Sequence, residues 1–211
     1  MSDKTAQIDH RIAVLSAILL GMVIITIAWC AYQSTLWSGI QTFLLRDSNA
    51  AARQSSTLTI QQGQYVSIDA IMFMSYINAI HDNNQELGQF YHERFRPELK
   101  TAVDAWLETD PLNNPNAPPH PFVMPEYGKK YADEIKQFSD LSGSKLEEAQ
   151  HANHTSDNYS MFALIYASVL FISAILDKFS SKRLRLIILI LGMVMFSITT
   201  TILFTMPVAM E

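Results

Sequence analysis

Three long apolar runs constrain this chain more than any motif does. Residues 12–31, 159–176 and 186–206 contain no Asp, Glu, Lys or Arg. A helix of about 20 residues is long enough to cross a hydrocarbon core of about 30 Å. We therefore predict an all-α integral membrane protein with transmembrane helices at 12–32, 159–176 and 186–206. The first run lacks a small-residue cleavage site and is predicted to be a retained anchor rather than a signal peptide.

Charge placement predicts the orientation of these helices. Four basic residues lie in the short link 177–185, namely Lys178, Lys182, Arg183 and Arg185. Short basic loops stay on the cytoplasmic side of a membrane, so we predict this link and the N-terminal residues 1–11 to be cytoplasmic. Three crossings then place residues 207–211 on the opposite side, together with the long segment 33–158.

The segment 33–158 is acidic, with 16 Asp and Glu against 9 Lys and Arg, as suits an exported domain. Aromatic residues near its junctions with the first two runs fit an interfacial belt: Trp29, Tyr32, Trp37 and Tyr159. Cys30 is the sole cysteine, so an intrachain disulfide is excluded.

Local signals predict a helical extramembrane bundle in this segment, built partly from extensions of the first two spans. Residues 33–80 contain no proline, and their apolar residues recur near a helical period, so the first helix should continue through them. The polar stretch 47–64 should be solvated, loosely packed or kinked near Gly63. A turn at 81–84, a helix from 85 to about 94 and a helix at 98–108, with Pro97 in its first turn, should follow. The helix that ends at 108 should have an apolar face formed by Leu99, Ala102, Val103, Trp106 and Leu107.

Six prolines in residues 110–125 predict an extended, stiff crossover, because proline lacks the backbone donor that a helix needs. Phe122 and Met124 should dock this crossover on the bundle, or else be exposed for a partner. A further helix should begin at Glu126 and lead to the second span. The predicted aromatic core consists of Phe90, Tyr91, Phe95, Trp106, Phe122, Tyr127, Tyr131 and Phe138.

Small residues on the spans predict faces for helix packing, because close backbone approach favours association in lipid. Residues of this kind recur every four positions: Ala13, Ala17 and Gly21; Ala163 and Ala167; and Ser197, Thr201 and Thr205. These faces should pack within one protomer. In the alternative interpretation the protein is a homo-oligomer, and the hydroxyl stripe Ser197, Thr201 and Thr205 lines a pore.

Two polar groupings are candidate sites. Glu148, His151 and His154 have a spacing that metal sites use on helices, although a solvated junction near the membrane has the same composition. Arg94 and Arg96 flank Phe95 between Glu93 and Glu98. They should form intradomain ion pairs, with an anion or lipid head-group site as the alternative.

Several short motifs together resemble a family of uncharacterised bacterial inner-membrane proteins. The resemblance runs from about Tyr32 to the C-terminus and is carried by Trp37-Ser38-Gly39, Arg94-Phe95-Arg96-Pro97-Glu98, Asn114-Pro115-Asn116-Ala117-Pro118, Pro121-Phe122-Val123-Met124-Pro125-Glu126-Tyr127 and Asp157-Asn158-Tyr159. It implies three spans and an exported helical domain, and it supplies no activity. His151 and His154 are not part of the pattern, and Ile40 stands where relatives tend to have an acidic residue.

The sequence favours a non-enzymatic inner-membrane scaffold, sensor or accessory subunit that acts through its periplasmic domain. The first alternative is a homo-oligomeric ion channel, and the second is a membrane-bound metalloprotein that uses Glu148 and His151. Neither a cofactor nor a nucleic-acid partner is predicted. The expected partners are the lipid bilayer and either further copies of the chain or another membrane protein.

Overall fold

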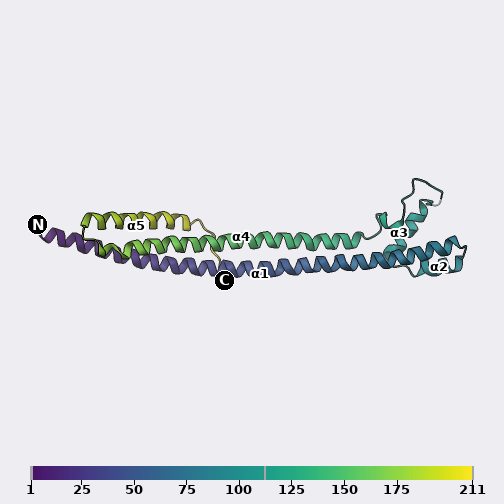
Figure 1. The fold of residues 1–211 in the computed structure, drawn as a ribbon, viewed down its shortest axis with the longest axis horizontal. Coiled ribbons are helices and arrows are strands. Elements are labelled where there is room, and N and C mark those ends of the chain that lie inside the picture. The colour runs from purple at the N-terminus through teal and green to yellow at the C-terminus, as the bar shows by residue number, and fades with distance from the viewer. Residues whose placement is uncertain (1, 112, 211) are drawn as a thin grey trace. The chain divides into compact units, whose positions relative to one another are not determined.

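The computed structural model describes residues 2–111 and 113–210, which are all-α: the chain is 83% helical, and the described residues contain no strand. Figure 1 shows the helices in chain order, from purple at the N-terminus to yellow at the C-terminus. The elements are α1 (Ser2–His81), α2 (Gln85–Glu93), α3 (Pro97–Glu108), the 3-10 turn η1 (Pro121–Val123), α4 (Lys129–Ala174), the 3-10 turn η2 (Leu176–Lys178) and α5 (Lys182–Leu203).

Three of these helices, α1, α4 and α5, are long and apolar enough to cross a membrane. This agrees with the prediction of three apolar helices. The third helix starts and ends earlier than the apolar run 186–206: α5 begins at Lys182 and ends at Leu203, and residues 204–206 form a turn.

Helix α1 continues without a break through Gly63 to His81. The polar stretch 47–64 packs against α4 through small side chains, since Ser48 and Ala51 are buried. The Ser48 hydroxyl donates to the backbone oxygen of Ser142 at 2.9 Å. Small residues therefore keep α1 and α4 close in a segment that has few large apolar side chains.

Local cap signals explain the next two helices. Asn83 adopts a positive φ of 57°, which ends α1, and the Asn84 side chain accepts a hydrogen bond from the Leu87 backbone N–H at the start of α2. Pro97 occupies the first turn of α3, where its missing N–H is tolerated. Both helices correspond to those predicted from the sequence.

The crossover contains no α-helix among its described residues. The helix predicted to follow it is α4, but α4 begins at Lys129, so the predicted start at Glu126 is wrong by three residues. The cause is Gly128, whose φ of +74° interrupts a helical path. Most other residues are disfavoured in that conformation, so glycine suits the position.

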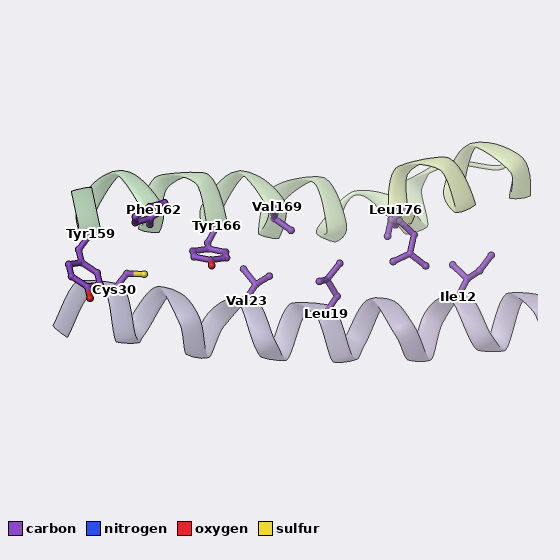
Figure 2. Packing of buried hydrophobic residues seen from close by; sticks show 10 residues of the cluster. Ile12, Leu19, Val23, Cys30, Tyr159, Phe162, Tyr166, Val169 and Leu176 are labelled. Carbon is purple, nitrogen blue, oxygen red and sulfur yellow. The ribbon is translucent and has the colours of Figure 1, made fainter. Parts of the chain in front are cut away.

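The described chain separates into two compact units, each with its own apolar core. The middle unit comprises residues 47–144, and the span unit comprises residues 2–46 and 145–210. Figure 2 shows the span-unit core, where α1 side chains face those of α4. Its fully buried members include Val23 from α1 with Tyr166 and Val169 from α4, and Leu189 is the α5 contribution.

Candidate functional site

An aromatic core organises the middle unit. Phe73 of α1 contacts the ring of Trp106 from α3 edge to face, with centroids 5.4 Å apart. Phe122 of η1 lies against Phe73 at 5.8 Å and against Tyr127 at 5.0 Å, again edge to face. Such pairs contribute roughly 0.5–1.5 kcal/mol beyond area burial. The structure thus places Phe122 on this core, with Met124 packed beside it.

Trp106 attaches the crossover to α3. Its indole N–H donates to the Pro118 backbone oxygen at 2.7 Å, while its ring is 7% exposed. A buried indole needs such an acceptor, and a proline-rich segment has carbonyl groups that no helix uses. The Trp106 contact therefore explains how a segment without regular structure is held against a helix.

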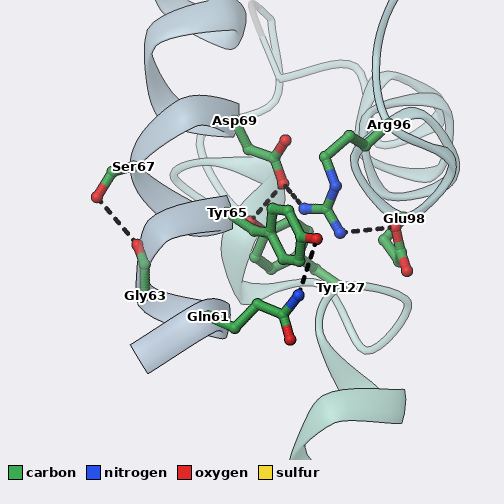
Figure 3. A network of polar contacts seen from close by, with 8 residues as sticks. All are labelled: Gln61, Gly63, Tyr65, Ser67, Asp69, Arg96, Glu98 and Tyr127. Atoms are coloured by element: carbon green, nitrogen blue, oxygen red, sulfur yellow. Dashed lines mark hydrogen bonds and ion pairs between the residues drawn. The ribbon is translucent and has the colours of Figure 1, made fainter. Parts of the chain in front are cut away.

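A buried carboxylate joins three segments of the middle unit (Figure 3). Asp69 of α1 is 1% exposed, and its Oδ2 accepts from Arg96 Nη1 at 2.8 Å and from the Tyr127 hydroxyl at 2.9 Å. Burying a carboxylate is costly unless it is paired and hydrogen-bonded, and both conditions hold here. We call Asp69, Arg96 and Tyr127 the Asp69 cluster.

The Arg96 guanidinium completes this cluster. It lies over the Tyr65 ring at 3.8 Å and reaches Glu98 Oε2 at 3.1 Å. Arginine suits the position because its planar group can stack and donate in two directions at once. Arg96 therefore forms the intradomain ion pairs expected of it.

Burial raises the pKa of Tyr127 well above the usual tyrosine range, and the hydrogen bond to Asp69 raises it further. The phenol therefore stays protonated, and able to donate its hydrogen bond, at pH values at which an ordinary tyrosine ionises. The adjoining cavity, bordered by Tyr65, Gly128 and Tyr131, measures about 10 Å³, room for about one water molecule. The cluster is thus suited to fixing three segments in place rather than to holding a substrate.

Arg94 differs from Arg96. Its guanidinium lies over the Phe90 ring at 3.7 Å, and its Nη1 donates to the Phe90 backbone oxygen at 3.2 Å. Phe90 itself is 47% exposed, so its predicted place in the core is wrong. Sequence reasoning instead missed Phe73 and Tyr76, which α1 contributes to the core.

In the span unit, three side chains hold the C-terminal segment. The Pro207 backbone oxygen accepts from the Trp37 indole N–H at 3.2 Å and from the Tyr159 hydroxyl at 3.0 Å. Gln33, which is fully buried, pairs its amide with the backbone N–H and oxygen of Ala209. We call residues 207–210 the C-terminal strap.

The strap was not predicted from the sequence, although a polar Gln33 next to an apolar run was a usable signal. Trp37, which was predicted to belong to an interfacial aromatic belt, is one of its anchors. The strap is joined to α5 by the turn at residues 204–206, so its bonds fix the end of α5 against α1 and α4.

The predicted small-residue lines differ in their contacts. Ala13, Ala17 and Gly21 are exposed, so the contact expected within one protomer is not made. The face of α1 that packs against α4 carries larger residues such as Leu19 and Val23. Their side chains fill the space between the two helices.

On the second span, Ala163 packs against the span-unit core, while Ala167 is exposed.

The hydroxyl stripe Ser197, Thr201 and Thr205 is exposed on α5 and the turn that follows it. Each hydroxyl donates to a backbone oxygen one turn earlier, at 2.8, 2.9 and 2.7 Å respectively. Thr200, which is next to Thr201 in the chain, instead joins two helices, because its hydroxyl lies 2.9 Å from the Tyr166 hydroxyl of α4.

The predicted metal candidates are not assembled into a ligand set. Glu148, His151 and His154 are exposed, and Glu148 accepts from Lys145 at 2.7 Å. Within the described residues, no group of three or more His, Cys, Asp or Glu side chains is placed to hold a metal ion.

No family model matches the chain, and no curated protein or solved structure is significantly similar to it. The resemblance to a bacterial inner-membrane family stays a prediction.

Proposed function

We propose that the protein is a non-enzymatic scaffold, sensor or accessory subunit of the bacterial inner membrane. In this proposal the three apolar helices cross the membrane, the N-terminus is cytoplasmic, and residues 33–158 are periplasmic. The middle unit then acts by contacting another protein.

The observation that carries this proposal is an unpaired apolar face on α1 within the middle unit. Four large side chains on one side of the helix are between 52% and 68% exposed: Ile60, Ile68, Ile71 and Met74. Their positions recur at helical spacing, opposite the face that carries Asp69 and Phe73. We call these four residues the α1 stripe.

Two further features support this interpretation. Contiguous apolar side chains exposed to water, here Ile68, Ile71 and Met74, tend to mark contact surfaces. The Asp69 cluster and the aromatic core give the stripe a rigid support, since they fix α1, α3 and the crossover to each other. A preorganised helix face loses less conformational entropy on binding.

The test places a charge on the stripe. Ile71→Asp should abolish co-purification of the partner from solubilised membranes while leaving the thermal unfolding of the protein unchanged. Leu141→Asp is the control, because Leu141 is an exposed residue of α4 in the same unit. Equal partner yields from wild type and Ile71→Asp would contradict the proposal.

A homo-oligomeric channel is the second candidate, favoured by the exposure of Ser197, Thr201 and Thr205 on the surface of one chain. Hydroxyls that satisfy their own helix can still face a water-filled pore. Thr201→Trp should then reduce ion flux in liposomes. A stable monomer in mild detergent would exclude this function.

A further inference from the structure

The span unit contains an apolar cavity of about 380 Å³ near the end of α5. This volume is within the range of known small-molecule pockets, roughly 300–1,000 Å³. Side chains from α1, α4, the end of α5 and the C-terminal strap line it, among them Ile25, Trp29, Tyr159, Leu203, Met206 and Val208.

The three hydroxyl groups that line the cavity are already hydrogen-bonded within the protein. Thr26 donates its hydroxyl to the Met22 backbone oxygen at 2.9 Å, and Tyr159 donates to Pro207 at 3.0 Å. The Thr200 hydroxyl is paired with Tyr166 at 2.9 Å. A ligand would therefore contact mostly carbon atoms. A water molecule would find few hydrogen-bond partners in such a space.

The C-terminal strap builds one wall of the cavity. Its backbone has no regular secondary structure and is anchored at Pro207 and Ala209. Met206, at the end of the preceding turn, and Val208, in the strap, line the cavity on either side of Pro207, whose backbone oxygen is anchored. The cavity is thus maintained by specific hydrogen bonds rather than left by loose packing.

We propose that this cavity binds one aliphatic acyl chain. The inference rests on the proposed membrane placement, because the bilayer is what supplies such chains at this part of the protein. The acyl chain of a phospholipid and a free fatty acid share this chemistry, and Trp29, which lines the cavity and is 44% exposed, suits the interface where their polar ends lie.

The test uses the full chain in phosphatidylethanolamine vesicles. In one arm the probe is a 16-carbon fatty acid with a diazirine on its chain, and in the other the same chain is esterified in phosphatidylethanolamine. Illumination should give adducts on the peptide that contains Met206 and Val208 in at least one arm, which identifies the source. Adducts spread evenly over exposed residues such as Ile187 and Ile190 would overturn the proposal.

A matched pair of variants tests the cavity itself. Val208 and Val194 are both 48% exposed, but only Val208 lines the cavity. Val208→Phe should lower the adduct yield by about tenfold, equivalent to about 1.4 kcal/mol of binding, and Val194→Phe should not change it. Unchanged yield in Val208→Phe, or a crosslink to a second copy of the chain in place of a lipid adduct, would overturn the proposal. If the membrane topology is retained, either result rejects acyl-chain binding in the cavity and does not affect the proposed function.

Discussion

The side chain of Gln33 pairs with the backbone of Ala209 through two hydrogen bonds, donating to its oxygen at 3.2 Å and accepting from its N–H at 2.9 Å. These two residues are 176 positions apart in the chain. A side-chain amide thus serves a backbone segment in the same way that a neighbouring strand would. This contact fastens the C-terminal strap to α1.

Replacing Gln33 should therefore release the strap. Gln33→Leu keeps the size of the side chain but leaves the Ala209 N–H and oxygen unpaired, at a cost of about 1–3 kcal/mol. We expect a lower unfolding temperature and faster carboxypeptidase removal of the C-terminal residues. Gln54→Leu, at an exposed position of the same helix, should change neither measurement. Equal digestion rates for both variants would reject the anchoring role of Gln33.

Phe122→Ala should destabilise the middle unit. The ring fills space between Phe73 and Tyr127, and its removal leaves part of that space empty. Because Phe122 is only half-buried, we expect a loss of about 2 kcal/mol, below the range for fully buried rings. Chemical denaturation followed by circular dichroism measures it. The neighbouring Val123, 54% exposed, provides the control: Val123→Ala should stay within about 0.5 kcal/mol. An unchanged denaturation midpoint with lost partner binding would instead assign Phe122 to a contact surface.

Tyr127 should give stability a specific dependence on pH. Its pKa is raised in the fold, so the folded state retains the phenolic proton at pH values where the unfolded state loses it. This stabilisation is complete below the ordinary tyrosine pKa of about 10 and is lost as pH rises toward the higher folded value. Tyr127→Phe should lower stability at pH 7 by about 1.5–3 kcal/mol and flatten its decline above pH 10. A parallel decline in wild type and variant would contradict this role.

Arg96 and Arg94 should respond differently to the same substitution. Arg96→Lys cannot reproduce donation to Asp69 and Glu98 together with stacking on Tyr65, so we expect a loss of about 1–2 kcal/mol. Arg94→Lys removes a contact with an exposed ring and should cost less than about 0.5 kcal/mol. Thermal unfolding of the two variants in one detergent gives the comparison. Equal losses would show that the Asp69 cluster does not stabilise the middle unit.

The sequence was most informative where structure depends on neighbouring residues. Asn84 and Pro97 identified the starts of α2 and α3, because capping and proline effects act within one turn. The three apolar helices were recognised from composition alone. Gly128 shows the limit of local signals. A glycine is compatible with the start of a helix, and only the positive φ of Gly128 in the structure shows that α4 begins after it, at Lys129.

Contacts between distant segments could not be predicted. Asp69 and Arg96 lie 27 positions apart, and nothing in their local sequence states that they meet. Periodicity correctly aligned Ala13 with Gly21 on one face, but it could not say which face α4 would cover. The hydroxyl stripe was ambiguous for the same reason, because a side chain that bonds its own helix leaves no sign of its neighbours.

The membrane topology is the claim on which the proposed function depends, and labelling of single cysteines tests it most directly. Cys30→Ser removes the sole natural thiol, after which Ser139→Cys in the middle unit and Ser180→Cys in the basic link each introduce one at an exposed position. A maleimide that cannot cross membranes should label position 139 in intact spheroplasts and position 180 only after the membrane is disrupted. The reverse pattern, or labelling of both positions in intact spheroplasts, would contradict the account.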